Sequence, residues 1–159
     1  MVMANLVISG SGFLDTTTAD LDGQPLAITT QTGTRLTLHA TEVQVGEARE
    51  ATLHVNNPLG SSEIGVEVDN PVPTLTSISP TSVTHHSGSV TLTLTGTDFR
   101  TGSTALASGS SCTTTYVSDT QLTAVVPSGK VIHAGTVPIT VSSPTPGGGN
   151  SGTVNLTAN

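Results

Sequence analysis

The stretch VTLTLTGTDF, residues 90–99, alternates apolar and polar side chains and ends in Gly, two polar residues and Phe. Alternate residues of a β-strand point to opposite faces, so Val90, Leu92 and Leu94 would face a core while the threonines between them face solvent. A related stretch, ANLVISGSGF, occupies residues 4–13, which is 86 positions earlier in the chain. Both copies therefore predict a half-buried strand that leads into a tight turn.

The repeat extends well beyond these two strands. Residues 4–60 can be laid over residues 90–146 without a gap, and the matches fall at alternate strand positions and at turns. The identical pairs include Leu6 and Leu92, Gly10 and Gly96, Phe13 and Phe99, Gly23 and Gly109, Leu36 and Leu122, Val55 and Val141, and Pro58 and Pro144. This constant displacement predicts two copies of one β domain.

The second copy is predicted to contain seven short strands, near residues 74–79, 89–95, 104–107, 111–117, 121–126, 136–142 and 152–157. The first copy is predicted to contain six, because residues 1–3 are too few to match the segment 73–89 that opens the second copy. Strands with one apolar and one Thr-rich face favour antiparallel sheets packed face to face. We find no helical pattern of useful length, although PSGKVIHAG (127–135) could hold one helical turn.

Composition excludes several classes of partner. The net charge is −7 over 159 residues; residues 1–70 carry all of this charge and residues 71–159 carry none. With four basic residues in the chain, we expect no nucleic-acid partner. The sequence contains no apolar run that could insert into a membrane, and we expect no signal peptide in this chain. Cys112 is the only cysteine, so an intrachain disulfide is impossible.

Four segments of the second copy carry a resemblance to a known family: PTLTSISPTSV (73–83), GSVTLTLTGTDF (88–99), TTYVSDTQLTAVVP (114–127) and VPITVSSPTPGGGNSG (137–152). They resemble the IPT/TIG family of immunoglobulin-like domains, in the style of its bacterial members. Residues 4–70 are similar to a diverged second member. With the periodicity, this resemblance implies an all-β chain of two tandem immunoglobulin-like β-sandwiches without significant helix. The expected domains are residues 1–70, which lack the first strand, and residues 71–159, joined at DNPVP (69–73).

The sequence predicts no catalytic, cofactor or metal site. It has no G-x-S-x-G motif for a nucleophile, and Cys112 aligns with Leu26 at an inward position, which predicts a buried thiol. Asp98 and Asp119 adjoin turns rather than a cleft, and His85 has only His86 beside it as a second metal ligand. The acidic stretch DTTTADLD (15–22) lacks the ligand order of a calcium loop.

Two candidate interaction sites remain. The first is the strand edge Ala4, Asn5, Leu6, Val7 and Ile8, which lacks the neighbour that residues 90–95 have in the second copy. A strand from another chain could complete this edge by β-augmentation; alternatively, the sandwich tolerates six strands. The second is Tyr116, the one aromatic residue expected to be exposed for stacking on a sugar.

The resemblance implies a non-catalytic module of multidomain surface proteins. The expected function is that of a structural and interaction protein in an extracellular assembly: a bacterial surface or secreted protein, or a virion or filament subunit that self-associates through the strand edge. The alternative is a carbohydrate-binding accessory module of a polysaccharide-acting enzyme. The expected location is extracellular, at a cell surface or in a virion.

Overall fold

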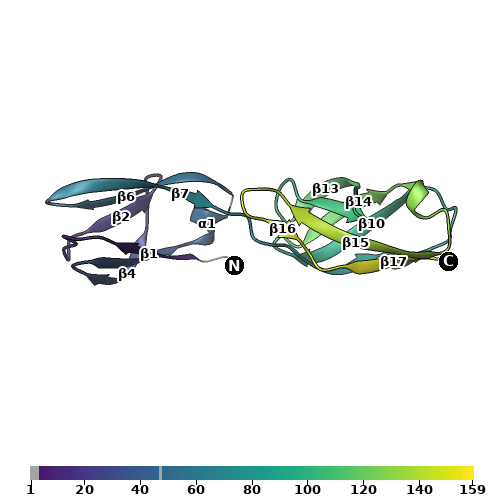
Figure 1. The fold of residues 1–159 in the computed structure, drawn as a ribbon, viewed down its shortest axis with the longest axis horizontal. Coiled ribbons are helices and arrows are strands. Elements are labelled where there is room, and N and C mark those ends of the chain that lie inside the picture. Colours follow the sequence, from purple (N-terminus) through teal and green to yellow (C-terminus); the bar gives the residue numbers. More distant parts are fainter. Residues whose placement is uncertain (1–3, 47) are drawn as a thin grey trace. The chain divides into compact units, whose positions relative to one another are not determined.

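A computed structural model describes residues 4–46 and 48–159 and divides the chain into two compact units. Unit 1 comprises Met1–Asp69 and unit 2 comprises Asn70–Asn159. Both units consist of β-strands arranged in two sheets, as Figure 1 shows for each. The chain is therefore all-β, with antiparallel sheets, as its periodicity predicts.

Unit 2 contains ten strands, several of them only two residues long: β8 (Thr74–Ser79), β9 (Ser82–Val83), β10 (Val90–Thr97), β11 (Thr104–Ala107), β12 (Ser110–Ser111), β13 (Thr113–Ser118), β14 (Gln121–Val126), β15 (Gly135–Ser143), β16 (Gly149–Asn150) and β17 (Val154–Ala158). One sheet has the order β13-β14-β10-β8, and the other has the order β12-β11-β15-β17-β9, with β16 paired to β15. The segment predicted at 111–117 is divided into β12 and β13, with Cys112 between them.

The pairing of β17 with β9 is parallel, which the prediction of purely antiparallel sheets did not include. The physical reason is that β8 and β9 are consecutive segments that change sheets. β8 runs antiparallel to β10 in the first sheet, and β9 then joins the edge of the second sheet beside β17. A single stretch of chain thus closes the same side of both sheets.

The core of unit 2 is built from the inward residues of both sheets. Leu92, Leu94 and Phe99 are completely buried there together with Leu75 and Ile78 of β8. A Cβ atom on Gly96 would lie 1.9 Å from the carbonyl oxygen of Thr74 and 2.7 Å from the Phe99 ring. Glycine is therefore required where the backbone of β8 and the Phe99 ring meet β10.

Unit 1 contains the elements β1 (Ala4–Ser9), β2 (Thr18–Leu21), β3 (Gln24–Pro25), β4 (Ala27–Thr32), β5 (Arg35–Ala40), α1 (Glu42–Val45), β6 (Arg49–Asn57) and β7 (Gly60–Val68). Its sheets have the orders β1-β5-β4 and β3-β2-β6-β7. The first six strands start 86 residues before β10, β11, β12, β13, β14 and β15. The strand registers agree as well, since Leu6 lies opposite Leu38 and Leu92 lies opposite Ala124.

The two helical elements also occupy equivalent places. A 3₁₀ turn, η1 (Ser128–Lys130), confirms that PSGKVIHAG holds one helical turn, and α1 takes the same position in unit 1. The Thr41 backbone N–H, at the start of α1, donates a hydrogen bond of 2.8 Å to Oε1 of Gln44. Within the described residues, no helix has the length and apolar character needed to cross a membrane.

Among the described residues of unit 1, none forms a counterpart of β8 or β9. β10 lies between β14 and β8, whereas β1 pairs only with β5. On the other sheet β17 pairs with both β15 and β9, whereas β7 pairs only with β6. Because β8 and β9 close the same side of unit 2, the described residues of unit 1 leave both of its sheets unpaired on that side.

This open side corrects one prediction about the core. The repeat predicts that Phe13 is buried beside Gly10, as Phe99 is beside Gly96. The ring does lie against Gly10, where a Cβ atom would be 2.8 Å from Cζ of Phe13, but the Phe13 side chain is only half-buried. The expectation of full burial is wrong: the Phe13 side chain is half-buried, and no strand formed by residues 4–46 or 48–69 covers the ring from the open side.

The two phenylalanines should therefore differ in their contribution to stability. We expect Phe99→Ala to lower the unfolding free energy of unit 2 by about 3–5 kcal/mol, the usual range for a buried phenylalanine. Phe13→Ala should lower that of unit 1 by about 1–2 kcal/mol, because less apolar surface leaves water when Phe13 packs. Urea denaturation followed by circular dichroism measures both. Equal losses for the two variants would contradict the difference in burial.

Candidate interaction groove

Five apolar side chains that are fully buried in unit 2 have half-buried counterparts in unit 1. The pairs, with the unit 1 residue first, are Leu6 and Leu92, Ile8 and Leu94, Phe13 and Phe99, Val45 and Val131, and Val55 and Val141. Residues deeper in the sandwich, such as Leu36 and Leu53, are fully or almost fully buried, like their counterparts Leu122 and Ile139. The loss of burial is thus confined to the open side of unit 1. We call the side chains of Leu6, Ile8, Phe13, Val45 and Val55 the groove.

The groove is hollow over much of its length. A cavity of about 440 Å³ reaches from Ile8 and Phe13 to Leu59 and Ile64, at the turn between β6 and β7. Leu59 is 77% exposed and Ile64 is 59% exposed, so this rim is apolar as well.

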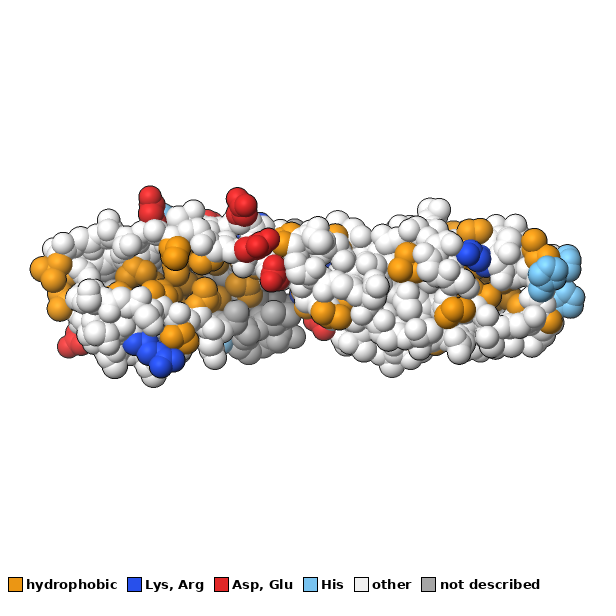
Figure 2. Space-filling model, in the orientation of Figure 1, with side chains coloured by type: hydrophobic (Ala, Val, Ile, Leu, Met, Phe, Trp, Pro, Cys, Tyr) orange, Lys and Arg blue, Asp and Glu red, His pale blue; other side chains and the backbone are white. Residues whose placement is uncertain are grey.

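A second cavity of about 230 Å³ lies further along, between Leu6 of β1 and Val66 of β7. Figure 2 shows the hydrophobic side chains of unit 1 as a band between its two layers. The groove and its rim therefore form one elongated apolar surface that follows β1 and β7.

The backbone of β1 completes this surface with hydrogen-bonding groups. The backbone N–H of Gly10 donates a hydrogen bond of 2.9 Å to the carbonyl oxygen of Thr34 on the β5 side. In an antiparallel pair the direction of these groups alternates along the strand, so those of Val7 and Ser9 point away from β5. Their counterparts in unit 2 are Thr93 and Thr95, which lie opposite Ser79 and Ser77 of β8.

The structure places all five predicted edge residues in β1. Leu6 and Ile8 face the groove, Val7 is 52% exposed on the other face, and Oδ1 of Asn5 lies 3.1 Å from Nδ1 of His39. The side chain of Ala4 lies outside the described part of the chain. Sequence reasoning missed the second open edge, β7. β9, the strand that closes the equivalent edge in unit 2, is two residues long and has no periodicity that the sequence could show.

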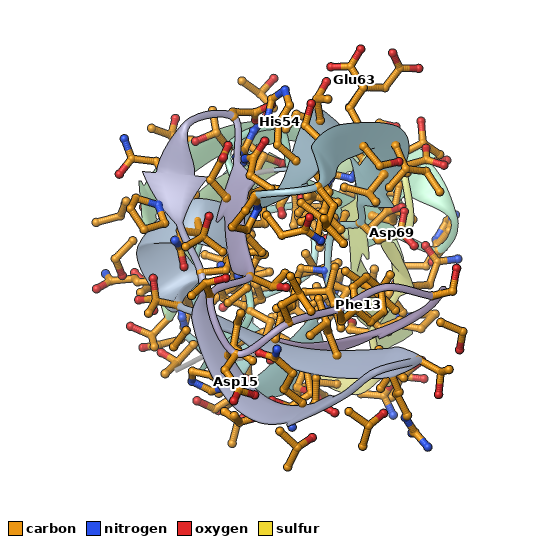
Figure 3. All side chains as sticks on the ribbon, turned by 90° about the vertical axis from the view of Figure 1, so that its left-hand side faces the viewer. Phe13, Asp15, His54, Glu63 and Asp69 are labelled. Carbon is orange, nitrogen blue, oxygen red and sulfur yellow. The ribbon has the colours of Figure 1, made fainter. Side chains whose placement is uncertain are left out.

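The outer face of the other sheet carries a row of ionisable side chains. Asp20, His54 and Glu63 lie directly opposite one another on β2, β6 and β7. Nδ1 of His54 is 2.9 Å from Oδ1 of Asp20, and Nε2 is 3.4 Å from Oε2 of Glu63, on the side shown at the top of Figure 3. Within the described residues, no group of three or more His, Cys, Asp or Glu side chains has the geometry of a metal site.

Two carboxylates of the acidic stretch 15–22 accept hydrogen bonds from backbone N–H groups of unit 1. Oδ1 of Asp20 accepts a hydrogen bond of 2.8 Å from the Gly23 N–H, and Oδ1 of Asp22 accepts one of 2.7 Å from the Thr52 N–H. The Thr52 bond and the guanidinium of Arg49, 3.3 Å from Oδ2, lower the pKa of Asp22. These carboxylates therefore act as turn and cross-strand partners.

The remaining candidates are dispersed over unit 2. His85 and His86 lie edge to face with ring centroids 5.1 Å apart, and Nδ1 of His85 lies within hydrogen-bonding distance of the Asn159 carbonyl oxygen. Tyr116 on β13 is 39% exposed. Asp119 lies in the turn between β13 and β14, and its carbonyl oxygen accepts a hydrogen bond of 2.9 Å from the Phe99 N–H. These residues do not form one site.

Cys112 is a buried, free thiol, as its alignment with Leu26 predicts. The backbone N–H groups of Cys112 and Leu26 make equivalent hydrogen bonds, to the carbonyl oxygens of Ala105 and Ala19. Burial raises the pKa of the Cys112 thiol, which lowers the fraction of reactive thiolate.

Cys112 should therefore react with a thiol reagent at least about tenfold more slowly in the native protein than in denaturant, because only the exposed thiolate is nucleophilic. Labelling with Ellman's reagent at about pH 8 measures the two rates, one in native buffer and the other in concentrated guanidinium chloride. Equal rates would show that the thiol is accessible.

Three comparisons relate the chain to known proteins. No curated protein matches it. Among solved structures, the plexin A4 extracellular region is 13% identical, with a TM-score of 0.46, over 98% of this chain and 16% of that one. The titin tandem A164-A165 is 12% identical, with a TM-score of 0.39, over 99% of this chain and 88% of that one.

A Bacteroides ovatus glucan-utilization protein, SGBP-B, solved with a mixed-linkage heptasaccharide, is 18% identical over 98% of this chain and 40% of that chain, with a TM-score of 0.39. The chain thus spans less than a fifth of the plexin chain and less than half of SGBP-B. A family model, described as the IPT/TIG domain, matches residues 73–158, which is more than half of the chain. This chain belongs to the IPT/TIG domain family.

Proposed function

We propose that the protein is a non-catalytic structural and interaction protein of an extracellular assembly, and that it joins a neighbouring protein chain at the open side of unit 1. The observation that carries the proposal is the groove beside an unpaired strand. Five apolar side chains are half-buried there although their counterparts in unit 2 are fully buried. An added strand would bury these side chains and pair the backbone groups of Val7 and Ser9 in one step.

The composition of β1 supports this use of the edge. Proteins usually block an exposed strand edge with charged residues or proline, because such an edge pairs with other strands. β1 reads ANLVIS and contains neither, whereas the open strand of the other sheet, β7, carries Glu63 and Glu67. Of the two edges on the open side, β1 therefore lacks the charges that discourage pairing at β7.

Self-association through β1 is the form of assembly that we propose to test first. When β1 of one copy contacts a different surface of the next copy, the contact is heterologous and builds a ring or a filament. The proposed settings are a bacterial surface or secreted protein and a virion or filament subunit. The extracellular location rests on the resemblance to bacterial surface members of the IPT/TIG family.

Carbohydrate binding is the second candidate, and the 39% exposure of Tyr116 is the observation that favours it. An exposed aromatic ring offers a flat surface for stacking. Tyr116 is the only tyrosine and the chain has no tryptophan, so ultraviolet-excited emission reports on this ring directly. A change in emission on adding soluble glucan oligosaccharides, together with binding in titration calorimetry that Tyr116→Ala abolishes, would favour this candidate over the protein-binding one.

Proline at position 7 tests the open edge. Val7→Pro removes one N–H that points away from β5, so it should prevent pairing with another strand while leaving the β1–β5 hydrogen bonds in place. Val7→Thr is the matched control, because it keeps both the N–H and the branched shape of the side chain. We expect the wild type and Val7→Thr to form species larger than one chain in light scattering, and Val7→Pro to remain monomeric.

Circular dichroism of the three proteins checks that each variant folds. A wild-type protein that remains monomeric at millimolar concentration would contradict self-association, as would a Val7→Pro variant that assembles like the wild type.

A further inference from the structure

Unit 2 contains the segment that fills the place left open in unit 1. In β8, Leu75 is 6% exposed and Ile78 is 3% exposed, and both belong to the core that includes Leu92, Leu94 and Phe99. Ile78 lies opposite Leu94, and Leu75 lies opposite Gly96. The residues of unit 1 that correspond to this contact surface are Leu6, Ile8, Gly10 and Phe13.

The spacing of the two buried residues of β8 is unusual for a strand. Leu75 and Ile78 are three positions apart, although strict alternation places inward residues two apart. The register explains the difference. Ser77 lies opposite Thr95 and Leu75 lies opposite Gly96, so one additional residue of β8, Thr76, is accommodated in a β-bulge. The segment of β8 that packs on unit 2 therefore has the pattern apolar, small polar, small polar, apolar.

None of the residues that the structure describes near Gly10 occupies the corresponding path in unit 1. At Gly96 the carbonyl oxygen of Thr74 lies where a Cβ atom would be, at 1.9 Å. At Gly10 the three atoms nearest to such a Cβ all belong to the Phe13 ring, and no backbone is among them. In unit 2 the backbone of β8 lies against Gly96. Among the described residues of unit 1, no backbone takes this position against Gly10, which adjoins the cavity that Ile8 and Phe13 line.

We propose that the groove of unit 1 binds an extended segment of another protein chain, antiparallel to β1, with two apolar side chains separated by two small polar residues. One apolar side chain lies opposite Gly10, against Phe13, and the other lies opposite Ile8. The segment pairs with the outward backbone groups of Val7 and Ser9. This inference rests on the proposed function and specifies the chemistry of its partner.

A segment of this kind fits the groove better than the edge of a second copy does. The apolar residues of β1 alternate strictly, with Leu6 and Ile8 two positions apart, so a second β1 lacks the bulged spacing of β8. Within the described residues, every strand already lies in a sheet of its own unit. Self-association through β1 is therefore the weaker mode, and a segment resembling β8 should displace it.

The first experiment supplies the segment in the same polypeptide. A copy of residues 73–89 replaces residues 1–3, so that the added segment leads into β1 as its original leads into β10. We expect calorimetry to show a rise of more than about 5 °C in the melting temperature of unit 1, because a domain of this size gains that much from roughly 1 kcal/mol. Tyrosine emission, which comes from Tyr116 alone, follows unit 2 as an internal reference.

The matched control carries Leu75→Asp and Ile78→Asp in the added copy only. It should leave the melting temperature of unit 1 unchanged, because a charged side chain in the groove would be buried without a partner. A segment that acted only by lengthening the chain would raise the melting temperature in both fusions, and that result would overturn the inference.

The second experiment tests spacing with a separate peptide. A fluorescein-labelled peptide of residues 73–83, PTLTSISPTSV, is titrated with the full chain and followed by anisotropy. A second peptide exchanges Leu75 and Thr76, which brings the apolar residues two positions apart. We expect the exchanged peptide to bind at least about tenfold more weakly than the native peptide. The Val7→Pro variant should bind the native peptide more weakly by a similar factor.

The outcomes separate this inference from the proposed function. Stabilisation by the fusion, with or without measurable binding of the free peptide, supports the inference even if the wild-type chain proves monomeric. The opposite combination has two parts: the wild type self-associates through the N–H of Val7, and the fusion neither stabilises unit 1 nor abolishes assembly. That result overturns the inference but is consistent with the proposed function. Equal affinity for the two peptides overturns the proposed spacing.

Discussion

The contact of β8 with β10 is the interaction on which the difference between the two units depends. In unit 2 this strand pairs with the backbone of Thr93 and Thr95, inserts two apolar side chains into the core, and continues into β9 at the edge of the second sheet. One segment thus closes both sheets and the space between them. The described part of unit 1 repeats nearly every other element of unit 2 at the same displacement, yet none of its residues forms this segment. The half-buried groove is the direct physical consequence, because the same side chains are present without the strand that would cover them.

An edge of this kind offers two kinds of unsatisfied interaction at once. Backbone groups that point away from β5 favour any strand as a partner, whereas the apolar groove and its cavity near Phe13 favour a segment with side chains of suitable spacing. The two edges also differ in charge, because the open strand of the other sheet carries Glu63 and Glu67 while β1 carries no charge. The side-chain contacts of Asp22 with Arg49 and of Asp20 with His54 lie on that sheet, apart from the side chains that line the groove. In our proposal, the interaction surface and these polar contacts therefore belong to different parts of unit 1.

Much of the architecture could be predicted from the sequence because it depends on local pattern. The alternation in VTLTLTGTDF and its copy predicts the strands, and the constant displacement predicts that the two units share their registers. The Gly-x-x-Phe turn predicts the contact of each glycine with its ring. Prediction failed where burial depends on a distant segment: Phe13 has the same local sequence signal as Phe99 but lacks a covering strand. The parallel pairing of β9 and the open edge of β7 were missed for the same reason, since a two-residue strand has no periodicity of its own.

Amide hydrogen exchange at single-residue resolution reports which N–H groups of β1 are hydrogen-bonded. The comparison requires the wild-type chain, diluted until light scattering shows one chain per particle. We expect the amides of Val7 and Ser9 to exchange nearly as fast as those of an unstructured peptide, while those of Leu6 and Ile8 are protected by β5. We also expect protection of the matched amides of Thr93 and Thr95, which β8 covers. Protection of Val7 and Ser9 equal to that of Thr93 and Thr95 in the diluted monomer would contradict the open edge.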